Sequence, residues 1–152
     1  MAQTTVIKCP HCATRNRVRP TPRGVPRCSV CHHPLPWIVE ADAATFNEEI
    51  VSSLPVLVDF WAPWCGPCRM VSPLVERMGR EHAGRLKVVK LDVDTAPAIS
   101  ARYHVQGIPL LVLIRGGAEV DRLVGAVPLE RLQAWVGPQL EPVSAEPVHP
   151  AE

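Results

Sequence analysis

Six cysteines arranged as three C-x-x-C pairs constrain this chain of 152 residues more than any other feature. The pairs are Cys9/Cys12, Cys28/Cys31 and Cys65/Cys68. The first eight residues, MAQTTVIK, lack the apolar core of a secretory signal peptide, and no apolar run approaches the roughly 18 residues of a membrane span. We therefore expect a cytoplasmic protein. In such reducing surroundings these pairs favour metal binding or redox catalysis over a framework of structural disulfides.

Charge and proline content divide the chain. Residues 1–36 contain six basic side chains and no acidic one, whereas the remaining 116 contain ten basic and fifteen acidic side chains, so the net charge is +1. Ten of the seventeen prolines lie in 1–36 or 138–152. We expect an amino-terminal module over 1–36, a main domain over 37–140 and a disordered tail over 141–152, with 33–36 as a short stiff linker.

Apolar patterning in the main domain alternates between strands and helices. Short apolar or alternating runs predict strands over 54–61, 86–93, 110–114 and 118–124, with a hairpin at Gly116-Gly117 between the last two. Helical spacing predicts helices over 43–51, 66–82, 96–104 and 129–136; the apolar positions of the second are Met70, Val71, Leu74, Val75 and Met78. This order predicts an α/β domain with a central mixed sheet flanked by helices.

The third cysteine pair lies between a predicted strand and a predicted helix. Free N–H groups and the positive end of the helix dipole stabilise a thiolate at Cys65. Cys68 is one helical turn further on and can attack a mixed disulfide formed at Cys65. Cys65 is thus the candidate nucleophile and Cys68 the resolving thiol. Half of a metal site and two inert core cysteines are the alternatives, but the Gly66-Pro67 insert in this context favours redox chemistry.

The first two pairs have the spacing of a zinc ribbon. Fifteen residues separate Cys12 from Cys28, and four thiolates would give one Zn²⁺ a closed tetrahedral site made of Cys9, Cys12, Cys28 and Cys31. A 36-residue segment with little apolar bulk needs such a metal to fold. Two disulfides or four free thiols are the alternatives. Because four thiols fill the coordination shell, we expect exposed imidazoles at His11, His32 and His33.

The segment 58–68, VDFWAPWCGPC, resembles the active-site strand and turn of the thioredoxins. The resemblance covers about 38–140 and implies the thioredoxin fold. It implies that Asp59 is a buried carboxylate beneath Cys68, which moves a proton as Cys68 becomes nucleophilic. It also implies that Pro109 is cis and faces the cysteine pair, and that the backbone at Ile108 pairs with an extended substrate. Lys90 matches a lysine near the aspartate, although a solvated strand end explains a lone lysine equally well.

The same resemblance implies a flat, fairly apolar substrate surface beside the dithiol. We expect Trp61 to serve in packing and the surface to comprise Trp64, Gly66, Pro67, Gly107, Ile108 and Gly125. Two positions depart from the family pattern. Leu110 stands where threonine is usual and Ile114 where phenylalanine is common; Leu110 could alter substrate preference or local hydrogen bonding.

The amino-terminal cysteines with Asn16-Arg17-Val18 also resemble the module of zinc-binding bacterial thioredoxins, the thioredoxin 2 type. Together the resemblances imply a monomeric protein-disulfide reductase without an organic cofactor. It would take electrons from NADPH through thioredoxin reductase and act on oxidised ribonucleotide reductase, peroxiredoxins and methionine sulfoxide reductases. The alternatives are a redox-sensing zinc protein and a chaperone-like module in which the ribbon controls partner binding.

A nucleic-acid-binding ribbon is a further interpretation. It rests on Arg15, Arg17, Arg19, Arg23 and Arg27. Residues 1–36 contain no aromatic side chain for base stacking, which argues against this interpretation.

Overall fold

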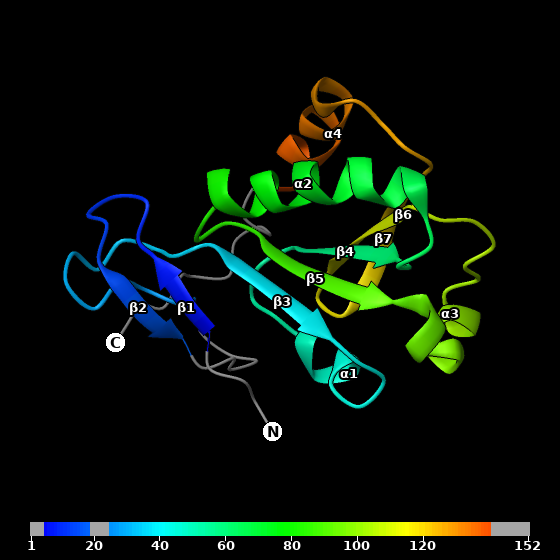
Figure 1. Cartoon of the computed structure of the whole chain (residues 1–152), viewed down its shortest axis with the longest axis horizontal. Coiled ribbons are helices and arrows are strands. Elements are labelled where there is room, and N and C mark those ends of the chain that lie inside the picture. The colour runs from blue at the N-terminus through cyan, green and yellow to red at the C-terminus, as the bar shows by residue number, and fades with distance from the viewer. Residues whose placement is uncertain (1–4, 19–24, 141–152) are drawn as a thin grey trace.

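A five-stranded mixed sheet forms the centre of the molecule in the computed structural model, which describes residues 5–18 and 25–140. The strand order is β3-β5-β4-β6-β7. The elements in chain order are β3 (Trp37–Ala41), α1 (Phe46–Glu49), β4 (Val56–Trp61), α2 (Gly66–Glu81), β5 (Lys87–Asp92), η1 (Val93–Thr95), α3 (Pro97–Arg102), β6 (Leu110–Arg115), β7 (Ala118–Val124), α4 (Leu129–Val136) and η2 (Gly137–Leu140). Helices α2 and α4 cover one face of the sheet, and α1 and α3 lie on the other (Figure 1).

Strand direction follows from the connections. Strands β3, β5 and β4 are mutually parallel, and helix α2 provides the crossover from β4 to β5. Strand β6 runs antiparallel to β4, and β7 antiparallel to β6. The predicted hairpin is present, since Gly116 and Gly117 have φ of +60° and +80°, the conformation that a two-residue turn requires. The expected mixed sheet flanked by helices is confirmed.

Alternating side chains of the central strands fill two separate cores. In β4, Val56, Val58 and Phe60 face α1 and α3, whereas Leu57 faces α2 and α4. Strand β6 alternates in the same way over Leu110–Arg115. Because residues of opposite parity lie on opposite faces, Asp59 belongs to the face covered by α2. This parity brings the carboxylate under the helix that follows the cysteine pair.

Helix α2 agrees with the predicted range 66–82 but differs on one side chain. Its buried residues are Cys68, Val71, Val75, Met78 and Gly79, and Pro73 lies inside it. Met70, expected on the apolar face, is instead 71% exposed. It lies about 100° around the helix from Val71, so it is turned away from the sheet. The expectation for Met70 was therefore wrong.

Two other elements differ from expectation. The range 43–51 forms only a four-residue helix, α1, whose N-cap is Thr45 and whose C-cap is Ile50. The residues before it form a turn instead, in which the N–H groups of Ala44 and Thr45 donate to the Asp42 carboxylate. Strand β3 was not predicted at all. Its residues Trp37–Ala41 complete the sheet by parallel pairing with β5, a partner about fifty residues away.

The amino-terminal segment forms a small unit that we call the ribbon, residues 5–18 and 25–36. Strands β1 (Thr5–Lys8) and β2 (Arg15–Val18) pair antiparallel, and Arg27 forms a bridge with Pro34. The segment 33–36, expected as a short stiff linker, packs against the ribbon, since Leu35 is fully buried with Cys9 and Cys28. Arg19, Arg23 and the tail 141–152, for which disorder was expected, lie outside the described residues.

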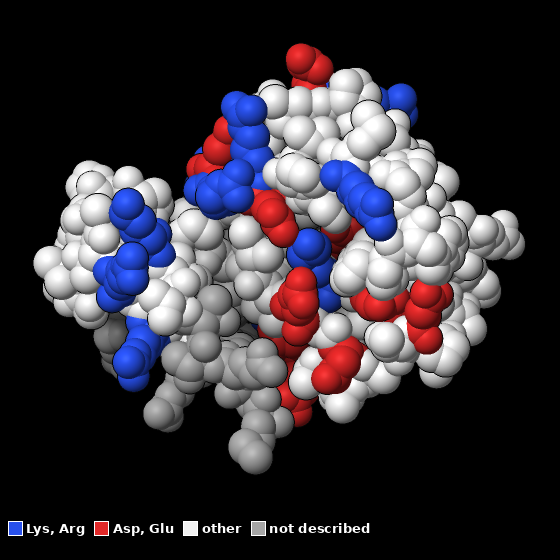
Figure 2. Space-filling model, viewed as in Figure 1, with Lys and Arg blue, Asp and Glu red and all other residues white. Residues whose placement is uncertain are grey.

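Charge is distributed unevenly on the face shown in Figure 2. The charged side chains visible on the ribbon are basic, whereas the neighbouring body of the sheet and its helices shows acidic and basic side chains together. Lys8, Arg15, Arg17 and Arg27 are all exposed on the ribbon. In the part of the chain that the structure describes, no helix is long and apolar enough to cross a membrane.

Candidate active site and metal centre

The cysteine pair lies where β4 ends and α2 begins. Cys65 is the N-cap residue of α2, and its sulfur accepts a hydrogen bond of 3.2 Å from the backbone N–H of Cys68. Pro67 occupies the first turn, where its missing N–H costs no helical hydrogen bond. The two sulfurs are joined in a disulfide, with 5.3 Å between the Cα atoms. The oxidised pair is therefore seated on the positive end of a sixteen-residue helix.

Asp59 lies on the α2 face of β4 and is fully buried. The hydroxyl of Ser72, in α2, donates to its Oδ2 at 3.1 Å, and Oδ1 has no hydrogen-bond partner among the described residues. Burial raises the pKa of the Asp59 carboxyl to about 6, against the opposing effects of the Ser72 hydrogen bond and the charge of Lys90. The carboxyl can therefore gain and lose a proton near neutral pH.

Lys90 pairs in register with Asp59 across β4 and β5. Its ammonium group, however, forms an ion pair of 3.0 Å with Glu76 of α2 and lies 5.8 Å from the centre of the Trp61 ring. The side chain is only 11% exposed, so a solvated strand end does not describe it. Lys90 affects Asp59 through its charge, which lowers the carboxyl pKa.

Ser72 and Glu76 were missed in the sequence. Both follow Cys68 along α2 at intervals of four residues, so Cys68, Ser72 and Glu76 lie on one helix face. This spacing was available as a signal, because polar residues four and eight positions after the second cysteine of the pair share the helix face that covers the strand carrying Asp59.

A cis peptide bond joins Ile108 to Pro109, as the family resemblance implied. Ile108 packs against the cluster of Ala62, Cys65 and Cys68, which places this loop beside the disulfide. The backbone N–H of Gly125 donates to the carbonyl of Pro109 at 2.9 Å, so the end of the loop, directly before β6, is held by the residue that follows β7.

The residues expected to form the substrate surface differ in exposure. Trp64 is 68% exposed and its indole N–H donates to Asp94 at 2.8 Å, whereas Trp61 packs partly against the cysteine cluster. Gly66 and Gly107 each have open space where a Cβ would lie. Pro67 is exposed, and Gly125, at φ +90°, is partly exposed. Leu110, by contrast, is buried in the core with Phe60, so its contacts are with the interior.

The four ribbon cysteines converge on one point. Their sulfurs all lie within 4.8 Å of one another, with 3.6 Å between Cys9 and Cys31 and 3.5 Å between Cys12 and Cys28. Four sulfurs at about 2.3 Å from a tetrahedral zinc would lie about 3.8 Å apart. The spacing and the donor chemistry therefore fit a single tetrathiolate metal ion. Backbone N–H groups, that of Cys31 foremost, lower the pKa of the Cys28 thiol to about 5, which favours the thiolate that a metal requires.

Two loops with the same hydrogen bonds present these sulfurs; we call them the first knuckle (Cys9–Thr14) and the second knuckle (28–33). In the first, the N–H of Cys9 donates to the Thr14 carbonyl, and the N–H of His11 points to the Cys9 sulfur. The second knuckle makes the same two hydrogen bonds, with each N–H donor and each acceptor nineteen residues further along the chain. Ala13 and His32, also nineteen residues apart, both adopt positive φ.

The three ribbon histidines are exposed, as expected. His11 and His33 stack with 3.7 Å between ring centres, one from each knuckle. Cys12 is the exposed member of the cysteine cluster, whereas Cys9 and Cys28 are each 1% exposed.

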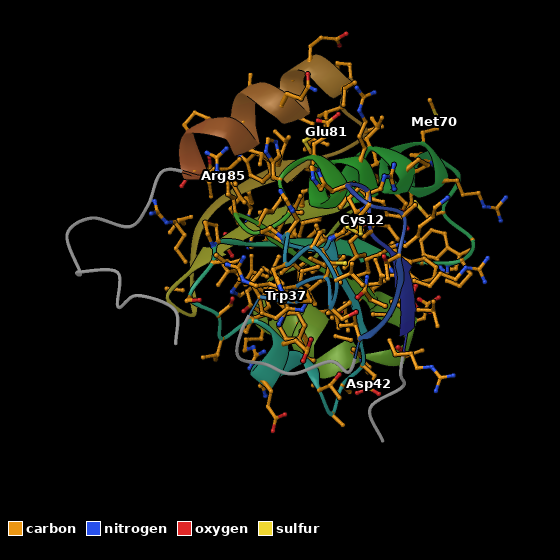
Figure 3. All side chains as sticks on the ribbon, turned by 90° about the vertical axis from the view of Figure 1, so that its left-hand side faces the viewer. Cys12, Trp37, Asp42, Met70, Glu81 and Arg85 are labelled. Carbon is orange, nitrogen blue, oxygen red and sulfur yellow. A yellow bond between two sulfur atoms is a disulfide. The ribbon has the colours of Figure 1, made fainter. Side chains whose placement is uncertain are left out.

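The four-cysteine cluster and the dithiol lie at opposite ends of the parallel strands. The ribbon leads into Trp37, which is in register with Lys87 at the start of β5, and Lys87 is in register with Val56 at the start of β4. Cys65 follows the other end of β4. That end lies about 20 Å from the start of the strand, because an extended strand rises about 3.3 Å per residue. In Figure 1 the ribbon lies at the left of the sheet and the start of α2 at the right. Figure 3 is viewed from the ribbon end, so the labelled Cys12 lies toward the viewer.

Comparisons with known proteins support this architecture. Residues 37–137 match the family model of thioredoxin. The chain is 50% identical over 86 residues to thioredoxin 1 of Nostoc sp., covering 56% of this chain and 80% of that protein. It is 43% identical over 98 residues to thioredoxin of Alicyclobacillus acidocaldarius (64% and 93% covered). It is 39% identical over 123 residues to chloroplastic thioredoxin M-type of Chlamydomonas reinhardtii (76% and 83% covered).

A C-x-x-C disulfide at the start of a helix, beside a cis-proline loop and on a five-stranded mixed sheet, defines a thiol–disulfide oxidoreductase. The chain belongs to the thioredoxin family. Thioredoxins as a class are reduced by thioredoxin reductase and act on oxidised proteins.

Proposed function

We propose that this protein is a cytoplasmic, monomeric protein-disulfide reductase with a zinc-binding amino-terminal module. The observation that supports this most directly is the position of Cys65, whose sulfur caps α2 and accepts the N–H of Cys68. A thiolate at that atom is stabilised by the same N–H and by the helix dipole. We assign residues 1–36 to the zinc module and 37–140 to the catalytic domain.

The reaction begins with the reduced pair. The Cys65 thiolate attacks one sulfur of a substrate disulfide, a mixed disulfide forms, and the other substrate sulfur leaves as a thiolate that takes a proton from water. The Cys68 thiolate then attacks the Cys65 sulfur and displaces the second substrate thiolate. The protein ends as the Cys65–Cys68 disulfide, and two electrons and two protons restore the dithiol. Thioredoxin reductase, supplied by NADPH, is the proposed donor.

Asp59 is the proposed proton acceptor for Cys68. Its pKa of about 6 leaves most of the carboxyl ionised at pH 7 and still basic enough to take a thiol proton. The carboxylate lies beneath α2 on the same side as Cys68, and a water molecule between them would carry the proton. Lys90 is a supporting residue, since its charge and its ion pair with Glu76 set the potential near the carboxylate.

Substrate recognition is assigned to the backbone at Ile108, the cis Pro109 and the surface around the dithiol. An extended substrate segment would pair with Ile108 as an added strand does. The open space at Gly66 and Gly107 leaves room for its backbone, while Trp64, Pro67 and Gly125 border the site. Trp61 serves in packing. Oxidised ribonucleotide reductase, peroxiredoxins and methionine sulfoxide reductases are the proposed substrates.

The test is reductase-driven reduction of a model protein disulfide. We expect Cys65→Ser to abolish turnover and to form no covalent adduct. Cys68→Ser, the matched control, should also stop turnover but accumulate a mixed disulfide through Cys65, visible by mass spectrometry. Equal rates from wild type and Cys65→Ser would refute the function, and an adduct on Cys68 rather than Cys65 would reverse the two roles.

The ribbon is proposed to hold one Zn²⁺ through Cys9, Cys12, Cys28 and Cys31. The metal would supply folding free energy, because the apolar cluster of Cys9, Cys28 and Leu35 is too small to hold the ribbon by itself. The exposure of Cys12 supports the second candidate, a redox-sensing module that loses zinc on oxidation. Zinc release during a peroxide titration separates the two, since a static site keeps its zinc after Cys65 and Cys68 have oxidised.

A further inference from the structure

Asn16, in β2, is a buried polar side chain in the ribbon and is 5% exposed. Its amide nitrogen Nδ2 donates to the carbonyl of Thr14 at 3.1 Å and to the sulfur of Cys28 at 3.5 Å. Its amide oxygen Oδ1 accepts from the backbone N–H of Ser29 at 2.8 Å and from the Ser29 hydroxyl at 3.1 Å. The amide therefore uses both of its protons and its oxygen.

These contacts connect the two knuckles. Thr14 ends the first knuckle, whereas Cys28 and Ser29 begin the second, and each knuckle otherwise makes the same hydrogen bonds within itself. The nineteen-residue repeat places Leu35 at the position that corresponds to Asn16, and Leu35 packs in the apolar cluster. The two knuckles therefore differ at this equivalent position, since the first is followed by the amide side chain of Asn16 and the second by the aliphatic side chain of Leu35.

We infer that Asn16 is a positioning residue for the proposed metal centre, joining the two knuckles and donating an N–H to the Cys28 thiolate. The inference rests on the proposed tetrathiolate site. An N–H directed at a thiolate offsets its charge, and partners outside the ligand shell hold ligands in orientation. A metal that bridges two loops needs both at a fixed separation, and Asn16 spans them without using a cysteine.

Asparagine suits this position because its side-chain amide provides two N–H donors and an acceptor oxygen, and the surrounding groups use all three. Aspartate would keep the acceptor toward Ser29 but lose both donors, and its charge would face the thiolates and the Thr14 carbonyl. Alanine would leave the Thr14 carbonyl and the Ser29 N–H without their buried partner. Loss of a partner outside the ligand shell commonly lowers metal affinity by roughly 10–100-fold.

The experiment uses the full chain loaded with Co²⁺, whose absorption reports thiolate ligation, in competition with a chelator of known affinity. The variants are Asn16→Ala, Asn16→Asp and Ser29→Ala, and Arg17→Ala is the control at an exposed neighbour in the same strand. We expect Asn16→Ala to lose roughly 10–100-fold in affinity. Asn16→Asp should lose at least as much, and Arg17→Ala should stay within about twofold. The sulfur-to-cobalt band should move in the Asn16 variants and stay in place in Ser29→Ala, which keeps the amide–sulfur contact.

Several outcomes would overturn the inference. Asn16→Ala within twofold of wild type would show that the amide does not hold the site. If only Asn16→Asp weakens binding, the added charge is the cause. If Asn16→Ala binds no cobalt, the cobalt affinity of Ser29→Ala becomes the deciding measurement. An equal loss of affinity in Ser29→Ala would make the serine, and not the asparagine, the residue that joins the knuckles. A wild-type chain that binds neither Co²⁺ nor Zn²⁺ would refute the metal site itself and this inference with it. Unchanged disulfide reduction in all variants shows that the catalytic domain is folded.

Discussion

Pro34 packs directly against Gly84, where the ribbon meets the loop between α2 and β5. A Cβ on Gly84 would lie 2.7 Å from Cγ of Pro34, and Gly84 has φ of +85°. Both facts require glycine at this position. The contact joins the ribbon to the loop between α2 and β5, at the end of the sheet away from the dithiol.

Gly84→Ala should lower the free energy of unfolding by about 2–4 kcal/mol, because it combines backbone strain with a clash against a rigid proline ring. Gly117→Ala is the matched control, since Gly117 has φ of +80° and open space at its Cβ. Denaturant unfolding measures both variants. Equal losses would mean that the Pro34 contact contributes nothing beyond the φ effect.

Asp59→Asn should stabilise the oxidised protein at pH 8. The folded-state pKa of Asp59, about 6, lies above the ordinary aspartate value, so the folded state favours the protonated carboxyl. Wild type therefore has its full stability below about pH 4, where Asp59 is protonated, and loses part of it as the pH rises through 6 and the buried carboxyl ionises. A gap of about two pH units corresponds to about 3 kcal/mol at most. The variant should therefore exceed wild type above pH 7 and match it near pH 3. Unfolding curves across pH measure this, and a pH-independent difference would contradict it.

Ser72→Ala should raise the pKa of Asp59 further, because the hydroxyl that it removes stabilises the ionised carboxylate. The pH at which the rate of disulfide reduction falls should move upward with that pKa. Infrared titration of the Asp59 carboxyl measures the pKa directly. Ser100→Ala is a control, since it removes a half-buried hydroxyl that donates instead to the backbone carbonyls of Ala96 and Val93. An unchanged or lowered pKa in Ser72→Ala would contradict the proposed coupling.

Lys87→Met should cost about 3–5 kcal/mol in the free energy of unfolding. Lys87 is fully buried, lies 3.4 Å from Glu49 and sits over the Trp37 ring, so its removal leaves a buried carboxylate without its cation. Adding Glu49→Gln should recover part of the loss. The exposed Arg77–Glu81 pair is the control, and Arg77→Met should change stability by less than about 0.5 kcal/mol. Equal effects at the two sites would refute the burial argument.

If the ribbon holds a metal as proposed, removing that metal should unfold the ribbon and leave the thioredoxin-family region, residues 37–137, intact. After treatment with a strong chelator under reducing conditions, amide exchange should accelerate at Cys9 and Cys28, whose N–H groups close the two knuckles. Exchange in β4 and the rate of disulfide reduction should stay unchanged. Ribbon amides that remain protected without metal would show that the small apolar cluster suffices.

The active-site region was predictable because its determinants are local. The apolar run over β4, the cysteine spacing and the helical pattern of α2 are contiguous in the chain, and they placed Cys65 at a helix start. The ribbon cysteines were likewise readable from spacing. Strand β3 was not, because five residues at the edge of a sheet take their structure from pairing with β5 rather than from their own pattern.

By itself the sequence determined which thiols are spaced as a redox pair, which thiols can hold a metal and at which cysteine the helix begins. Tertiary structure decided which groups surround each of these side chains and how deeply each is buried. Only the fold shows that Ser72 bonds Asp59, that Lys90 turns to Glu76, and that Asn16 reaches across to Ser29. The reason is physical, since motif spacing is a property of neighbouring residues. Burial, a shifted pKa and a hydrogen bond between distant loops arise only when separate segments exclude water together.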